Sequence, residues 1–286
     1  FSKKLEKEGS SNFESELIIG IFYLKNNRND LAQKYFLKIK ERNSNLLLNN
    51  FIAKSLLDWS SFNSLDFNEA KKRINNIDSN YFDNLKKIQN VFLHCYYKKD
   101  NTDSLFNSLI SDKKIDFSRY NYFYASYLHR MNKTKESEKA VNVALQKYPR
   151  NLLLNQLKQD LKNRKLKYNF SCKNLSHVSA EILYIAANAL SSQNINTYSN
   201  FYLNLSKYLN GEFYSFDTLL AENFYKTGNN EKAKEVYKKI GNNGEAYFWY
   251  SSKQIANIYL KDKKDKEAIK TLKKAYEKIN YKNIYE

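Results

Sequence analysis

Small residues recur at nearly constant spacing in the second half of the chain: Ala187, Ala221 and Ala256 are 34 and 35 residues apart. A second set follows each of these about a dozen residues later: Ser199, Ala233 and Ala268. Small residues at fixed positions let two helices approach closely, and larger neighbours fill the groove beside them. The period therefore predicts helix–turn–helix units stacked side by side into an all-α array.

The first half of the chain carries the same pattern less regularly. Gly20 is the small residue of a unit predicted over 13–43, and Ala125 that of a unit ending at Pro149. The two lie 105 residues apart, three steps of 35, so the phase is kept. Between them, from about 51 to 110, we expect helices at 52–56, 70–77, 81–97 and 105–110, with a lengthened turn over 59–66.

A further amphipathic helix is expected over 151–167, followed by a polar break at 169–176. This break predicts two blocks: 1–168, an N-terminal repeat block, and 169–286, a C-terminal block of three repeats. The last repeat has no obvious polar capping helix, which solenoids need. We therefore expect the natural protein to continue beyond Glu286, and the start at Phe1 suggests a processed or truncated piece.

Composition excludes several classes. The chain has 286 residues with one proline and six glycines, whereas an all-β sandwich needs turn residues about every 8–12 positions. The longest apolar runs, Ile18–Leu24 and Ile182–Leu190, are too short to span a membrane. The two cysteines, Cys95 and Cys172, stand far apart in unlike contexts, the first in an apolar helix and the second in an exposed polar stretch. No disulfide is expected from them.

The formal charge of +18 raises the alternative of nucleic-acid or anionic-surface binding. Only seven of the 48 basic residues are arginine, and the chain is rich in Lys, Asn, Ile, Tyr and Phe. These residues have A/T-rich codons, so a bias in base composition accounts for most of the excess. Lysines scattered along helix faces chiefly keep the surface soluble, and the alternative stays open.

No constellation of catalytic groups is visible. The three histidines, His94, His129 and His177, have no partner at metal-ligand spacing, and no phosphate-binding glycine loop or hydrolase motif occurs. Asp262, Asp265 and Glu267 stand among lysines and indicate a solvated turn. We predict a chain that is not an enzyme, with no catalytic residues, metal or cofactor.

The regular units resemble the tetratricopeptide repeat at its small and large positions. The chain also resembles tetratricopeptide proteins of marine alphaproteobacteria with A/T-rich genomes, at Leu85–Asn90, Phe117–Asn121, Cys172–Asn174, Ala180–Ile182 and Leu220–Tyr225. The resemblance implies an α-solenoid forming a right-handed superhelix. It also favours a periplasmic or envelope-associated location, with the cytoplasm left open.

Arrays that resemble this one bind extended peptides in the groove lined by the first helix of each repeat. The groove residues implied here are Tyr122, Tyr184, Asn188, Glu222, Lys253 and Asn257. Lys253 and Asn257, four residues apart, resemble half of a clamp that some members use for a peptide carboxylate. Our first hypothesis is a non-catalytic scaffold for a protein or peptide partner; nucleic-acid binding is the alternative, and support of a catalytic domain outside this sequence is a third.

Overall fold

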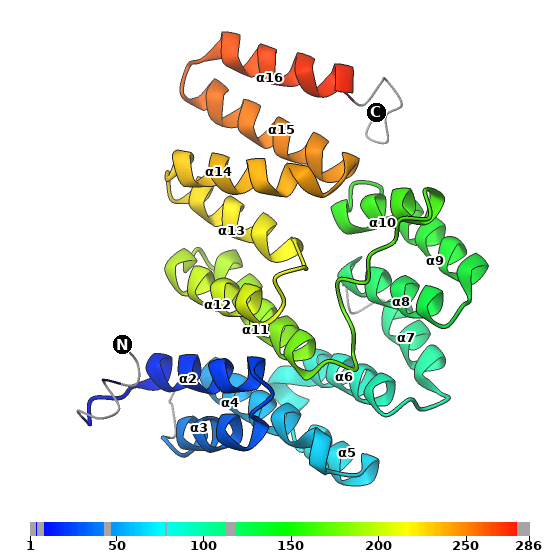
Figure 1. Ribbon diagram of the computed structural model, residues 1–286, viewed down its shortest axis with the longest axis vertical. Helices are drawn as coiled ribbons and strands as arrows, with labels where there is room; N and C mark the ends of the chain where they lie inside the picture. The colour runs from blue at the N-terminus through cyan, green and yellow to red at the C-terminus, as the bar shows by residue number, and fades with distance from the viewer. Residues whose placement is uncertain (1–3, 5–8, 43–46, 78, 113–117, 279–286) are drawn as a thin grey trace. The chain divides into compact units, whose positions relative to one another are not determined.

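The computed structural model describes residues 4, 9–42, 47–77, 79–112 and 118–278, so Phe1, Asn43, Phe117 and Glu286 lie outside it. Within these residues the regular structure is α-helical, with two short 3₁₀ turns and no strand (Figure 1). The chain forms two compact units, each made of two segments. Unit 1 comprises 1–102 and 170–212, and unit 2 comprises 103–169 and 213–286.

Unit 1 contains seven of the described helices: α2 (Phe13–Lys25), α3 (Asn29–Glu41), α4 (Leu47–Ser61), α5 (Phe67–Asn75), α6 (Ser79–Tyr96), α11 (Leu175–Ser192) and α12 (Asn196–Leu209). Its second segment packs back onto the first, because α11 contacts α4 and α12 contacts α2. Hydrogen bonds also join these segments. Lys25 Nζ donates to the Leu209 carbonyl at 2.9 Å, and the Tyr202 hydroxyl donates to Asn49 Oδ1 at 3.3 Å.

Unit 2 is also built from an earlier and a later segment. Its described helices are α7 (Thr102–Ser111), α8 (Ser118–Arg130), α9 (Thr134–Lys147), α10 (Leu152–Lys162), α13 (Ser215–Lys226), α14 (Asn230–Ile240), α15 (Glu245–Lys261) and α16 (Asp265–Lys278). Helix α10 packs on α8 and α9 within its own segment and on α15 of the later one.

Five helix pairs share one turn geometry: α2–α3, α8–α9, α11–α12, α13–α14 and α15–α16. Three residues separate the helices of each pair, and the middle one is left-handed: Asn27, Asn132, Asn194, Gly228 and Lys263, with φ between 58° and 77°. The next amide then donates to a carbonyl five residues back, as Ile195 N does to Leu190 O at 2.9 Å. This is the Schellman ending of a helix, which glycine and asparagine favour.

The small residues sit where the helices of each pair meet. Gly20, Ala125, Ala187, Ala221 and Ala256 of the first helices are matched twelve residues later by Ala32, Ser137, Ser199, Ala233 and Ala268, and the alanines of both sets are at most 1% exposed. At Gly20 even a methyl group is too large, because a Cβ there would stand 2.5 Å from Phe36 Cε1. The predicted helix-pair fold is confirmed: the chain is an all-α array of tetratricopeptide-like pairs.

The irregular region departs from the prediction at one turn. Helix α4 runs on to Ser61 and is followed by a 3₁₀ turn at Phe62–Ser64, so the expected turn over 59–66 is wrong in its first part. The reason is Trp59, which is fully buried and donates its indole N–H to Gln89 Oε1 at 2.9 Å. A polar partner on α6 thus lets this aromatic residue extend the helix.

The helix expected over 151–167 is also shorter than predicted, since α10 ends at Lys162. Arg164 adopts φ 53°, and Lys165 N donates to the Asp160 carbonyl at 2.9 Å. This is again a Schellman-type end. The expected division into blocks 1–168 and 169–286 stays a prediction about the repeats, because each compact unit draws on both blocks.

Candidate functional site

In unit 2, α13 and α15 are each the first helix of a repeat, and a side chain of one contacts a side chain of the other. Glu222, on α13, accepts a hydrogen bond of 2.6 Å from the Tyr250 hydroxyl of α15. The Tyr250 ring in turn meets Tyr237 of α14 edge-on, with centroids 5.9 Å apart. Burial, followed by the charge of Glu222, raises the pKa of Tyr250, so this hydroxyl is a fixed neutral donor. The cluster thus orients Glu222.

Lys253 and Asn257 continue the same face of α15, at three and seven residues beyond Tyr250. Both side chains are exposed, and neither makes a hydrogen bond or an ion pair within the described residues. Their backbone is a helix of 17 residues whose other face is buried. Lys253 and Asn257 therefore present polar groups to solvent from the same helix as Tyr250, the residue that holds Glu222.

Tyr122, on α8, takes a different position from the other candidates of unit 2. Its ring stacks on Phe213 with centroids 5.7 Å apart, and its side chain is only 6% exposed. Burial raises the pKa of its hydroxyl to about 12. It nevertheless lines a cavity of about 230 Å³, together with Phe213, Tyr214 and Tyr247. Tyr122 thus belongs to the wall of a pocket, not to an open groove.

The polar side of this pocket is organised by Gln156, on α10. Its amide nitrogen donates to Asp160 Oδ1 at 2.8 Å, and its oxygen accepts from the buried Ala246 N at 3.2 Å. Burial raises the pKa of Asp160, which the Gln156 hydrogen bond partly offsets. Lys165 and Lys167 are also among the lining residues and are exposed. The pocket can hold a small polar group between aromatic walls and two cationic side chains.

Tyr184 and Asn188 are the two candidates that lie in unit 1, both on α11. Tyr184 is half-buried and Asn188 is exposed. They stand in the same repeat positions as Lys253 and Asn257 relative to their small residues, Ala187 and Ala256. The structure thus places Glu222 on α13 and Lys253 and Asn257 on α15, puts Tyr122 in the wall of a pocket, and assigns Tyr184 and Asn188 to unit 1.

The histidines have structural partners. His94 Nδ1 lies 2.8 Å from Asn101 Oδ1, and His129 Nδ1 lies 2.7 Å from the Tyr168 hydroxyl. His177 Nδ1 accepts from Ser171 N at 3.1 Å. In the part of the chain that the structure describes, no group of three or more His, Cys, Asp and Glu side chains could hold a metal ion.

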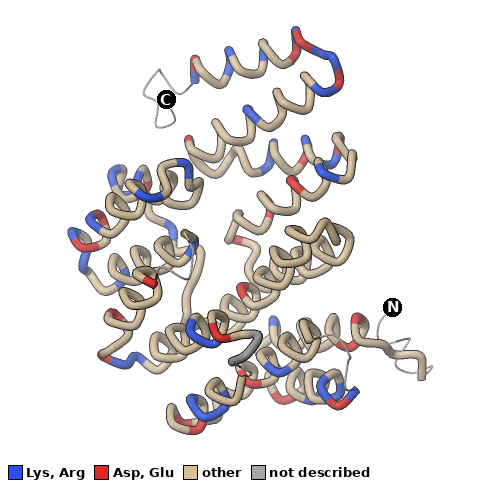
Figure 2. The backbone as a smooth tube through the Cα atoms, turned by 180° about the vertical axis from the view of Figure 1, so that it is seen from behind, with Lys and Arg blue, Asp and Glu red and all other residues tan. Residues whose placement is uncertain are grey.

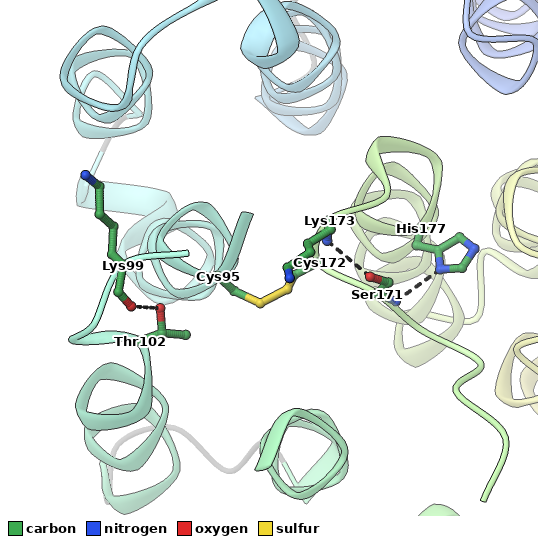
Figure 3. The surroundings of a disulfide bond; sticks show 7 residues. All are labelled: Cys95, Lys99, Thr102, Ser171, Cys172, Lys173 and His177. Carbon is green, nitrogen blue, oxygen red and sulfur yellow. Dashed lines mark hydrogen bonds between the residues drawn. A yellow bond between two sulfur atoms is a disulfide. The ribbon is translucent and has the colours of Figure 1, made fainter. Parts of the chain in front are cut away.

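A disulfide joins Cys95, in α6, to Cys172, in the turn before α11 (Figure 3). The expectation that the two cysteines stay unpaired is therefore wrong. Cys95 is buried as expected, and the Cα atoms lie 5.9 Å apart, which suits a disulfide. The two cysteines are 77 positions apart, so their pairing left no local signal in the sequence.

The turn that carries Cys172 is held by its own hydrogen bonds. Besides the Ser171–His177 bond, Lys173 N donates to Ser171 Oγ at 3.3 Å (Figure 3). Asn174 then caps α11 by accepting from Ser176 N at 2.9 Å and from His177 N at 3.3 Å. These bonds fix the position of Cys172 relative to α11, so the disulfide links that helix to α6.

Within each unit, the described basic residues are spread over several helices (Figure 2). Figure 2 shows Lys and Arg distributed over the helices of both units and interspersed with Asp and Glu. Nucleic-acid binding surfaces concentrate positive charge instead. Among the described helices, none combines the length and the apolar character that crossing a membrane requires.

No model of a known protein family matches the chain, and no curated protein matches it. Some solved structures do match the chain, and one of them is the crystal structure of the TPR domain of P58(IPK). It is 14% identical, superposes with a TM-score of 0.29, and the match covers 95% of this chain and 76% of that one. So loose a superposition carries no argument, and the fold rests on the helix pairs described above. Nothing found bears on the resemblance to proteins of marine alphaproteobacteria.

Proposed function

We propose that this protein is a non-catalytic scaffold that binds a protein or peptide partner, and that in unit 2 the partner lies on the α13–α15 face. The observation that carries the proposal is the pair Lys253 and Asn257. Both are exposed on a helix whose other face is buried, and neither makes a hydrogen bond or an ion pair within the described residues. The wider support is the repeat itself, since stacked helix pairs offer extended surfaces for recognition.

The chemistry of this face selects the kind of partner. Lys253 offers a cationic donor and Asn257 both a donor and an acceptor, four residues apart on one helix. Glu222, held by Tyr250, offers an acceptor on the neighbouring helix. An extended peptide matches this set, with a carboxylate against Lys253 and backbone amide groups against Asn257 and Glu222.

The test places a photo-crosslinking amino acid at Asn257 of the full chain and exposes the protein to native lysate. The control carries the same residue at Asn142, which is exposed on α9, a second helix of its repeat. Protein adducts at position 257 that survive nuclease and high salt, and that are absent at 142, would support the proposal. Equal adducts at both positions, or nucleic acid alone, would overturn it.

The captured partner then allows a quantitative step. Lys253→Ala with Asn257→Ala should weaken binding by about tenfold or more, because a lost hydrogen bond to a charged group costs about 1.5–3 kcal/mol. The matched control, Lys139→Ala with Asn142→Ala, removes the same residue types from the exposed face of α9. Unchanged affinity in the first double variant would refute the assignment of this face.

A further inference from the structure

The disulfide of unit 1 connects the two segments from which that unit is built. Cys95 belongs to the segment 1–102, and Cys172 is the third residue of the segment that begins at Phe170. Between them the chain passes through residues 103–169, which belong to unit 2. The two sulfurs therefore meet only after unit 1 has brought its segments together.

Noncovalent contacts also join the two segments near the disulfide. Helix α11 packs on α4 and α12 on α2, and Lys25 and Tyr202 make hydrogen bonds between the segments. Next to the disulfide, the rings of Phe92 and Phe170 lie 5.1 Å apart. The disulfide thus locks an arrangement that the surrounding side chains already specify. The chain has only these two cysteines, so no competing pairing exists.

The two sulfurs differ in access. Cys95 is 4% exposed and lies in the buried part of α6. Cys172 is half-buried in a surface turn, and Lys173 and Asn174 beside it are exposed. An oxidant too large to enter the core can therefore reach Cys172 and not Cys95. Thiol–disulfide exchange requires such access, because the attacking thiolate must approach along the disulfide bond that breaks.

We propose that Cys172 is the site at which a disulfide-carrying oxidant introduces the Cys95–Cys172 bond, and that the protein therefore matures in a compartment that oxidises thiols. The Cys172 thiolate attacks the oxidant's disulfide and releases one of its sulfurs as a thiolate. The Cys95 thiolate then attacks Cys172 Sγ and releases the second. The protein's two thiols lose two protons and two electrons, and the oxidant's disulfide becomes a dithiol. A reducing cytosol would return the pair to thiols.

The first measurement counts thiols in the protein as it occurs in its source cells. Free thiols are blocked with N-ethylmaleimide at lysis, the protein is reduced, and the newly exposed thiols are labelled with a second reagent. Mass spectrometry should find both cysteines blocked against the first reagent and open to the second. Both cysteines carrying N-ethylmaleimide would overturn the proposal.

The second measurement tests the order of attack with oxidised glutathione as the probe. Cys95→Ser leaves only Cys172, and Cys172→Ser leaves only Cys95; circular dichroism first establishes that both full-length variants are folded. The Cys95→Ser protein should form its mixed disulfide at least tenfold faster than the Cys172→Ser protein. Equal rates would refute Cys172 as the entry site. Should either variant fail to fold, the thiol count on the native protein still decides the compartment.

Discussion

Unit 1 and unit 2 face the same assembly problem and solve it by different means. Each joins an earlier and a later segment of the chain. Unit 1 uses a covalent bond, Cys95–Cys172, together with a few hydrogen bonds between segments. Unit 2 has no cysteine available, because both belong to unit 1. The described contacts that hold its later segment are noncovalent.

The contacts of unit 2 combine aromatic and polar groups. The Phe213 ring stacks on Tyr122 and lies beneath the Arg119 guanidinium, 4.6 Å from the ring centroid. Gln156 accepts from Ala246 N, so α10 provides a capping acceptor for α15. Reduction of the single disulfide should therefore loosen unit 1 selectively, whereas unit 2 depends on many contacts, each of modest strength.

The largest expected effect comes from removing the disulfide. Cys95→Ser with Cys172→Ser should lower the free energy of unfolding of unit 1 by about 4.5 kcal/mol, the chain-entropy value for a loop of this length. Unit 2 should keep its stability. Native-state hydrogen exchange resolves the two units, and the amides of α6 and α11 should lose protection. Equal loss of protection in both units would mean that they do not unfold independently.

Phe213→Ala is the corresponding change in unit 2. Phe213 is 2% exposed and contacts Tyr122, Phe123 and Phe216. A cavity of that size in a packed aromatic cluster costs about 3–4 kcal/mol. We expect the loss to appear in α8 and α13 by hydrogen exchange, with α6 and α11 unaffected. Phe213→Leu, which keeps most of the volume, should cost much less and serves as the control.

Much of this comparison could not have been predicted from the sequence. The helix pairs could, because the small residues recur at fixed spacing and the contacts between paired helices are local. The disulfide could not, since Cys95 and Cys172 meet through the packing of α11 on α4, which no spacing encodes. The same holds for the two units, whose segments alternate along the chain.

The candidate site shows the same limit. Repeat register predicted that Glu222, Lys253 and Asn257 share first-helix positions, and their placement on α13 and α15 follows from it. Register could not predict that Tyr122 is buried, because Phe213, which covers it, lies outside the repeat pattern. Nor could it predict the hydrogen bond from Tyr250 to Glu222, although Tyr250 stands one helical turn before Lys253 in the sequence.

Gly20→Ala tests the tight pairing in unit 1. The added Cβ would stand 2.5 Å from the Phe36 ring, so one helix must shift. Overpacking of this kind costs about 1–3 kcal/mol. A thermal melt measures the loss, and Phe36→Leu in the same chain should restore part of it. A melt unchanged by Gly20→Ala would show that Phe36 moves aside freely.

Ala221→Leu makes the equivalent change in unit 2. Ala221 is fully buried where α13 meets α14, and the larger side chain should again cost roughly 1–3 kcal/mol. The substitution Lys226→Leu, at an exposed position of the same helix, controls for the change in composition. If both leucines gave the same melting temperature as the parent chain, the assigned repeat register would be wrong.

The smallest effect concerns the serines that replace alanine in two pairs. Ser199 Oγ donates to the Ala187 carbonyl at 2.7 Å in unit 1, and Ser137 Oγ to the Ala125 carbonyl at 2.8 Å in unit 2. Alanine already fills this position at Ala233 and Ala268, so Ser→Ala fits without strain. Each should cost only about 0.5–1 kcal/mol, the net value of a neutral hydrogen bond.

Chemical denaturation of the two single variants measures this directly, and the two losses should agree. Equal values would mean that the pairing of helices is the same in both units, and that they differ only in how their segments are joined. A markedly larger loss for Ser199→Ala would place part of the stability of unit 1 in the α11–α12 pair itself. The disulfide would then hold in place a pair that depends on its own hydroxyl bond, and unit 1 would be the weaker unit even when oxidised.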